Sequence, residues 1–206
     1  MVKASDASES VVPSNPLEKL EKDYGRFSEI VNSKKVLDFG CGNGFQSVAM
    51  ANKFSAQVFG LDTNEATLKR ASKYASVNAP ENGGVEFLTK IPDERLGTFD
   101  VVISQNSMEH FPQPKEIVDF MKSTIHDKGL ILITFGPPWF APYGSHMHFF
   151  CRFPWINVLF SERTVMKVRE KYRNDGAKHY TEVESGLNKM SVSKFEKILN
   201  LSLIHI

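Results

Sequence analysis

The sequence predicts a doubly wound α/β fold built on a mostly parallel sheet. Short, predominantly apolar segments recur before residue 136, and helix-length amphipathic segments separate them. Strands of this kind are typical of a parallel sheet that is covered by helices on both faces. A third observation is the glycine-rich loop Gly40, Gly42 and Gly44, which directly follows the first apolar segment and precedes a predicted helix.

The elements follow in order along the chain. Residues 17–31 predict a leading helix, because apolar residues recur there at three- and four-residue steps. Asn64 is placed to cap a later helix, the run from Asn82 to Gly84 predicts a turn, and Pro112 or Pro114 opens a further helix. Strands are predicted at Lys35–Phe39, Gln57–Leu61, Val85–Leu88, 99–104 and 129–135, with helices at Phe45–Phe54, about 64–76 and about 112–126.

The length and composition fit a single globular domain with mixed charge, which we place at residues 17–200. The 206 residues are 41% hydrophobic and carry a net charge of +1, which gives no general attraction to nucleic acid or anionic membrane. No apolar run approaches the roughly 20 residues that span a bilayer. Two cysteines cannot build a disulfide framework, so a reducing, cytoplasmic location is expected. The Ser-rich residues 1–16 lack the apolar stretch of a signal peptide and predict a disordered tail.

The alternation of strands and helices stops after residue 135. An insert at 136–187 follows, rich in aromatic residues, proline and glycine, and a long insert of this kind is more often a functional lid than a spacer. Within and after it, helices are predicted at about 162–173 and from about Ser191. Basic residues at 163–178 are interleaved with Glu and Asp, which favours a solvated helix face over an RNA-binding surface.

The spacing of the glycine loop separates two classes of nucleotide site. A dinucleotide fingerprint, G-x-G-x-x-G, needs glycine at position 45, where this chain has Phe45. The observed pattern is D-x-G-x-G-x-G, with Asp38 two residues before Gly40. This pattern resembles the first motif of the class I S-adenosyl-L-methionine (SAM) dependent methyltransferases, and residues 99–111 resemble the fourth motif of the same family. The resemblance covers about residues 24–135 and implies a Rossmann-like fold.

The resemblance implies a set of SAM-binding residues. Asp38 would orient the ammonium group, the loop formed by Gly40, Cys41, Gly42 and Gly44 would present backbone amides to the methionine portion, and Ser104 and Gln105 would lie beside the sulfonium. Asp62 would accept hydrogen bonds from the ribose hydroxyls, and Thr63 beside it is also a candidate SAM-binding residue. The alternative for Asp62 is the N-cap of the next helix, a role for which Thr63 and Asn64 compete.

Two positions depart from the family or leave a choice open. Family members usually carry an acid after the third strand for the adenine amine, whereas this chain has Thr89 and Lys90 there, so backbone or Thr89 contacts would substitute. Arg26 can meet the SAM carboxylate, or it can be an exposed residue on a helix face.

Four residues are candidate catalytic groups for the acceptor. If the acceptor is a hydroxyl, a base must take its proton, and His146, His148, Tyr143 or His110 can do so, with His146 preferred. The pair Glu109 and His110 is open between catalysis and a structural hydrogen bond. The alternative for the insert is a small cap in which the aromatic residues are core and the histidines bond to turns. His-x-His without a third ligand does not predict a metal site.

The function predicted from these motifs is methyl transfer from SAM to a small-molecule or lipid-like acceptor, with O-methylation preferred. A nucleic-acid or protein methyltransferase of the same fold is an alternative, which the neutral charge and the absence of an Asn/Asp-Pro-Pro-Tyr-type motif at 104–107 disfavour. A SAM-binding regulator without catalysis is another alternative. The sequence carries no signal for the oligomeric state.

The end of the chain predicts a fragment. The class I methyltransferase fold normally finishes with a sixth strand and an antiparallel seventh, and nothing after Ser191 supplies them. Residues 201–206 also resemble the translation of a transposase end sequence that is used as an adapter in sequencing libraries. Both observations predict a C-terminally truncated domain with a non-native tail at 201–206.

Overall fold

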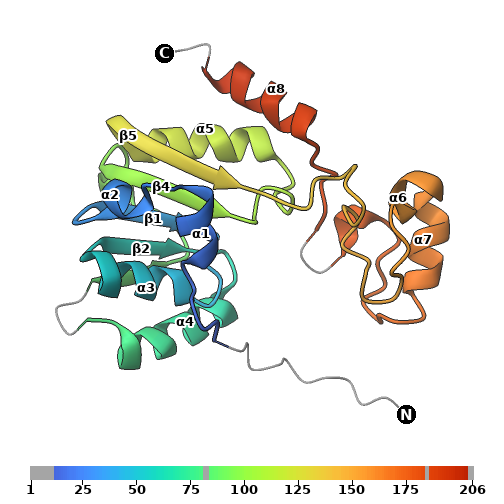
Figure 1. Cartoon of the computed structure of the whole chain (residues 1–206), viewed down its shortest axis with the longest axis horizontal. Helices are drawn as coiled ribbons and strands as arrows, with labels where there is room; N and C mark the ends of the chain where they lie inside the picture. The colour runs from blue at the N-terminus through green and yellow to red at the C-terminus, as the bar shows by residue number, and fades with distance from the viewer. Residues whose placement is uncertain (1–11, 81–83, 184–185, 204–206) are drawn as a thin grey trace. The chain divides into compact units, whose positions relative to one another are not determined.

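The computed structural model describes residues 12–80, 84–183 and 186–203. It contains a five-stranded sheet with the order β3-β2-β1-β4-β5 (Figure 1). β1 pairs in parallel with β2 and with β4, and β2 pairs in parallel with β3. These findings confirm the doubly wound, mostly parallel sheet. The strands are β1 (Lys35–Phe39), β2 (Gln57–Leu61), β3 (Val85–Leu88), β4 (Phe99–Gln105) and β5 (Ile125–Thr134).

The order of the strands creates a switch in direction beside β1. The chain moves outward from β1 to β2 and β3, and then returns to the other side of β1 with β4. In open parallel sheets, ligands bind outside the carboxyl ends of the strands at such a switch. The helices between the strands are α3 (Phe45–Phe54), α4 (Glu65–Asn78) and α5 (Pro114–Thr124).

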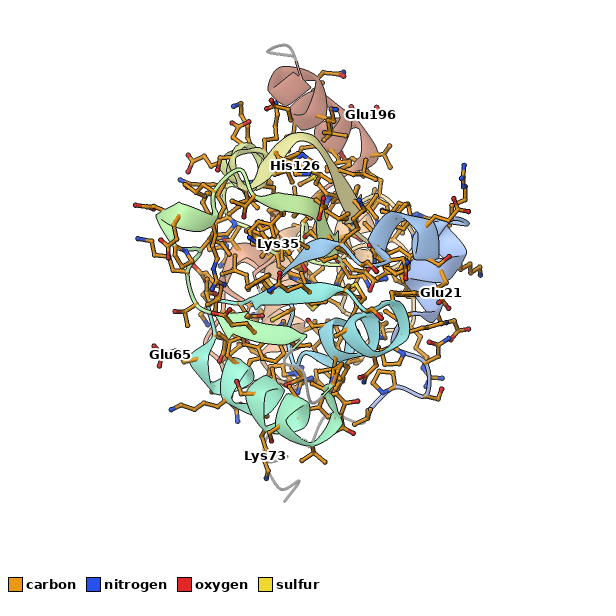
Figure 2. All side chains as sticks on the ribbon, turned by 90° about the vertical axis from the view of Figure 1, so that its left-hand side faces the viewer. Glu21, Lys35, Glu65, Lys73, His126 and Glu196 are labelled. Atoms are coloured by element: carbon orange, nitrogen blue, oxygen red, sulfur yellow. The ribbon has the colours of Figure 1, made fainter. Side chains whose placement is uncertain are left out.

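Burial explains why the central strands β1 and β2 are mostly apolar. Four of the five residues of β1 and of β2 are buried, so neither face of these strands meets water. The helices bury one side only: α4 buries Leu68 and Ala71, whereas Glu65 and Lys73 are exposed and point away from the sheet (Figure 2).

The chain divides into two compact units. The first comprises 1–103 and 124–130, and the second comprises 104–123 and 131–206. The second unit contains α6 (Ile156–Leu159), α7 (Glu162–Arg169) and α8 (Val192–Leu203). It has a hydrophobic cluster of its own, formed by Trp139, Met147, Ile156, Val165, Met166, Ala177, Tyr180 and Leu187. The insert is therefore a packed structure, in agreement with the alternative that some of its aromatic residues are core.

Several predicted boundaries are wrong. The leading helix is broken into α1 (Glu18–Asp23) and α2 (Phe27–Val31), with Gly25 between them. α7 ends at Arg169 rather than near residue 173, and β5 begins at Ile125 rather than residue 129. The basic face is also not uniformly solvated, because Arg169 is only 5% exposed.

Parts of four predictions fall outside the described residues: 1–11 of the tail, Asn82 and Gly83 of the predicted turn, 184–185 of the insert, and 204–206 of the last segment. Residues 201–203 form the end of α8. Within the described ranges, no helix has both the length and the apolar character needed to cross a membrane.

Candidate active site

The glycine loop adopts backbone angles that favour glycine at all three positions. Gly40, Gly42 and Gly44 have φ values of 81°, 54° and 74°. A Cβ on Gly44 would lie 2.4 Å from Phe87 Cζ, so packing against β3 requires glycine there. A Cβ on Gly42 would meet nothing within 4 Å. Gly42 therefore leaves open space above the backbone, as a site that admits a ligand requires.

Backbone and carboxylate contacts hold this loop to the end of β2. The amides of Gly40 and Cys41 donate to the Leu61 carbonyl at 2.8 and 3.0 Å. The Gly42 amide donates to Asp62 Oδ2 at 3.1 Å, and Asp62 Oδ1 accepts from the Asn64 amide at 2.9 Å. Each carboxylate oxygen has a second lone pair, so Asp62 can still accept hydrogen bonds from a ligand.

The alternative role for Asp62, as the helix cap, is not what the structure shows. Asn64 is the N-cap of α4, and its side chain accepts from the Thr67 amide at 3.0 Å. Thr63 is exposed. The predicted cap at Asn64 is confirmed.

Asp38 is a buried carboxylate at the carboxyl end of β1, and 2% of the residue is exposed. Its oxygens accept from Ser47 Oγ at 2.6 Å and from Gln46 Nε2 at 3.2 Å, both on α3. Burial raises the pKa of Asp38 to about 6; the hydrogen bonds from Ser47 and Gln46 lower it, and the charge of Asp62 raises it further. A cation that arrived beside Asp38 would stabilise its charged form.

The N-terminus of α3 is available to an anion. Gly44 is its N-cap, no side chain caps it, and its first turn contains no acidic residue. The helix has ten residues, so its first amides carry the partial positive charge that binds carboxylates and phosphates. An anion site at α3 and a buried carboxylate at Asp38 together suit a zwitterion.

The remaining predicted SAM residues lie at the ends of β3 and β4. Ser104 Oγ and Gln105 Nε2 are buried and have no hydrogen-bond partner, so both are available to a ligand. Thr89 and Lys90 line a cavity of about 520 Å³ together with Glu65 of α4. Arg26 forms an exposed ion pair with Glu29 on α2. This agrees with the second of its two predicted roles, an exposed residue on a helix face.

Two candidate histidines lie together in the second unit. The rings of His110 and His146 are edge to face, with centroids 5.7 Å apart. His110 Nδ1 lies 2.8 Å from the Gly186 carbonyl, which can only accept, so Nδ1 carries the proton. In neutral His110 the lone pair is therefore on Nε2, which lies 4.0 Å from Glu109 Oε1.

His146 has a similar arrangement. Its Nε2 is buried without a partner, while the ring forms a hydrogen bond with the Pro137 backbone. Burial lowers the pKa of His146, and the charges of His110 and His148 lower it further; Glu109 and the Pro137 bond act in the opposite direction. The backbone of His146 has a φ of 57°, the left-handed region that few residues other than glycine adopt. The fold thus holds a neutral imidazole with an unpartnered nitrogen.

The other two candidates have different surroundings. The Tyr143 hydroxyl donates to the Arg152 carbonyl at 3.4 Å, and His148 is exposed. Both line a cavity of about 670 Å³, which His146 and Phe149 also line. Of the four predicted catalytic residues, the structure therefore groups His110 with His146, and His146 with His148 and Tyr143.

Sequence reasoning missed the residue that holds the Glu109 turn in place. The Asn188 side chain donates to the carbonyls of Met108 and Phe111 at 2.7 and 2.8 Å, and its amide donates to the Glu109 carbonyl at 2.9 Å. Glu109 Oε1 accepts from the Gly136 amide at 3.2 Å, and Oε2 is buried without a partner. No local pattern connects Asn188 with residues that precede it by almost 80 positions.

Comparison with known proteins decides the family. The sequence profile of a methyltransferase domain matches residues 30–137, which is slightly more than half of the chain. The chain belongs to this methyltransferase-domain family. The matched region of the methyltransferase domain contains the glycine loop, Asp38, Asp62 and the end of β4.

Curated relatives match about half of this methyltransferase-domain protein. It is 37% identical over 106 residues to the ubiquinone biosynthesis O-methyltransferase of Idiomarina loihiensis, covering 49% of this chain and 42% of the relative. It is 30% identical over 105 residues to the mitochondrial enzyme of that name from Schizosaccharomyces pombe, covering 50% and 38%. The chain thus spans about two fifths of the length of these relatives.

Solved structures show the same fold. A protein from Bacillus halodurans that carries a methyltransferase name has a TM-score of 0.59 at 20% identity, covering 90% of this chain and 67% of that one. The magnesium protoporphyrin IX methyltransferase of Synechocystis, solved with S-adenosylhomocysteine (SAH), has a TM-score of 0.52 at 21% identity, covering 89% and 68%. These identities establish the architecture and not the substrate.

Proposed function

We propose that this chain is an enzyme that transfers a methyl group from SAM to a small-molecule or lipid-like acceptor, with oxygen as the preferred acceptor atom. One observation carries the proposal: an open glycine loop leads into an uncapped helix N-terminus beside the buried carboxylate of Asp38. Membership of the methyltransferase-domain family supports the reaction class. The names of the relatives support a small-molecule acceptor and an oxygen atom.

The first unit offers a complementary group for the carboxylate, the ammonium group and the ribose of SAM. The amides at the start of α3 suit the carboxylate, Asp38 suits the ammonium group, and Asp62 suits the ribose hydroxyls. Ser104 and Gln105 at the end of β4 have unpartnered polar atoms to offer. SAM supplies a methyl group on a positively charged sulfur. The acceptor oxygen bonds to the methyl carbon as the carbon–sulfur bond breaks, and the electron pair stays on sulfur, which becomes the neutral thioether of SAH.

We propose that His146 is the base that takes the proton of the acceptor hydroxyl. A hydroxyl acceptor must lose its proton as the new bond forms, and a neutral imidazole with an unpartnered Nε2 can take it. Burial keeps the pKa of His146 below its ordinary value, so the ring is in its basic form at neutral pH. His110 is the second candidate, because its Nδ1 bonds to the Gly186 carbonyl and its Nε2 therefore carries a lone pair when the ring is neutral.

Two alternatives predict different results. A SAM-binding regulator would bind SAM but would methylate nothing in an acceptor screen with radiolabelled SAM. A nucleic-acid or protein methyltransferase would label macromolecules in that screen rather than small phenols and lipids. A cytoplasmic site of action remains a prediction from the cysteine content.

The SAM assignment is tested by calorimetry on two glycine variants. Gly42→Ala places a methyl group in the open space above the loop and should weaken SAM binding at least tenfold. Gly97→Ala is the matched control, because Gly97 has a φ of 67°, also has nothing within 4 Å of its Cβ position, and lies in a distant turn. Both substitutions carry a similar backbone cost of about 1–2 kcal/mol. Unchanged SAM affinity in Gly42→Ala, or NAD binding as tight as SAM binding, would refute the assignment.

A further inference from the structure

A small cavity in the second unit has an unusual lining. Its volume is about 190 Å³, below the roughly 300–1,000 Å³ of sites for drug-sized ligands, so it suits a single ring. None of the described residues around it is acidic. They are His110, His146, Met147, Phe149, Arg169, Arg173, Val183 and Leu187.

The two arginines of this cavity differ in whether a carboxylate of the described residues neutralises their charge. Arg169 is buried and forms a two-pronged pair with Asp175, with nitrogen–oxygen distances of 2.6 and 2.5 Å. That pair holds the pKa of Asp175 at about 2, so the carboxylate neutralises Arg169 at any ordinary pH. Arg173 instead lies over the ring of Phe149, 4.6 Å from its centroid. Within the described ranges, no carboxylate forms an ion pair with Arg173, so its charge is available.

The rest of the lining suits a planar apolar body. Met147, Phe149, Val183 and Leu187 provide apolar walls. The Nδ1 of His110 donates to the Gly186 carbonyl, so its Nε2 is the nitrogen that a ligand can contact. His146 and Phe149 line both this cavity and the larger one of about 670 Å³. The two cavities are therefore neighbours that share two lining side chains.

We propose that the acceptor belongs to the aromatic carboxylates, with its carboxylate on Arg173 and its ring against Phe149. A guanidinium recognises a carboxylate through two parallel hydrogen bonds, and none of the described lining residues is acidic. A hydroxyl on the same ring lies within a cavity that both His110 and His146 line. The proposal rests on the proposed function, because it names the substrate class for the same methyl transfer.

The test measures binding of benzoate and benzamide to the full chain, by ligand-observed NMR without SAM. Benzamide matches benzoate in shape and lacks its charge. Benzoate should bind at least tenfold more tightly, and added salt should weaken benzoate binding only. Arg173→Gln should reduce benzoate affinity at least tenfold and leave benzamide unchanged, while Arg173→Lys should lose less. Lys171→Gln, which removes an exposed cation outside the cavity, should have no effect.

Three results would overturn the proposal: equal affinity for the two probes, no binding of benzoate at millimolar concentration, or unchanged benzoate affinity in Arg173→Gln. SAM affinity is measured separately on the same preparation. If the wild-type protein did not bind SAM, the proposed function would be refuted. Benzoate binding would then show only that the cavity is an anion site. SAM binding without benzoate binding would refute only the substrate class.

Discussion

At the scale of single residues, Asp38 meets two opposed demands. It lies among buried residues, where an uncompensated negative charge is costly, and in the proposed function it supplies the negative charge that faces the ammonium group of SAM. Its hydrogen bonds from Ser47 and Gln46 offset only part of the cost, because the pKa still rises to about 6. The ligand-free protein therefore carries a destabilising charge at neutral pH that binding would relieve.

This argument predicts that Asp38→Asn stabilises the ligand-free protein and abolishes SAM binding. Because the folded-state pKa is raised, the folded state binds more protons than the unfolded one, and stability falls as pH rises from about 4 through about 6. At pH 7 the substitution should raise the free energy of unfolding by up to about 3 kcal/mol. Urea denaturation between pH 4 and 8 measures this change.

Asp100→Asn is a control of opposite sign. The Lys35 amide donates to the Asp100 carboxylate at 2.8 Å and lowers its pKa. The stability that the Asp100 carboxylate contributes is present above the ordinary pKa of aspartate, and it is lost as the pH falls through the lowered pKa of the folded state. This variant should lose stability at pH 7 and keep its SAM affinity. A destabilised Asp38→Asn protein that still binds SAM would contradict the role given to Asp38.

At the scale of elements, predictability follows burial. The predicted bounds of β1, β2, β3 and α3 are confirmed, because an apolar run or a glycine stop marks each end. The break at Gly25 was missed since the apolar positions on both sides keep the same helical step. The insert was predicted only as an insert, because its order comes from contacts such as those of Asn188, which join distant segments and leave no periodic pattern.

The contacts of Asn188 predict that its replacement destabilises the turn that carries Glu109 and His110. In Asn188→Asp the side chain keeps its shape but loses the donors to the carbonyls of Met108 and Phe111. The second unit should be destabilised by about 1–3 kcal/mol, because two part-buried carbonyls lose their partners. Hydrogen exchange at 108–111 measures the effect and should become faster.

Asn78→Asp removes one exposed bond to the Tyr74 carbonyl on α4 and serves as the control. It should change the free energy of unfolding by less than about 1 kcal/mol. Equal exchange at 108–111 in Asn188→Asp and in the wild type would show that this turn does not depend on Asn188.

At the scale of the whole molecule, the proposed contacts to the carboxylate, the ammonium group and the ribose of SAM belong to one compact unit, and the proposed base belongs to the other. The glycine loop, Asp38 and Asp62 are in the first unit, and His110 and His146 are in the second. Asp38 and the glycine loop could be proposed as SAM contacts from the sequence because one short motif contains them. The grouping of His110 with His146 could not, since 36 positions separate them and the cluster forms only when the insert folds. This division predicts that cofactor binding and proton removal can be lost separately.

His146→Asn tests that separation, because asparagine tolerates the positive φ of this position better than most residues and cannot act as the base. Turnover with an acceptor found in the radiolabel screen should fall by roughly 10²–10⁴-fold, while calorimetry shows unchanged SAM affinity. In the wild-type protein, kcat/KM should decline only below the ordinary pKa of histidine, since burial lowers the pKa of His146. His148→Asn removes the competing imidazole, which is exposed. A larger loss in His148→Asn than in His146→Asn would transfer the base to His148, and near-normal turnover of His146→Asn from pH 6 to 9 would exclude His146.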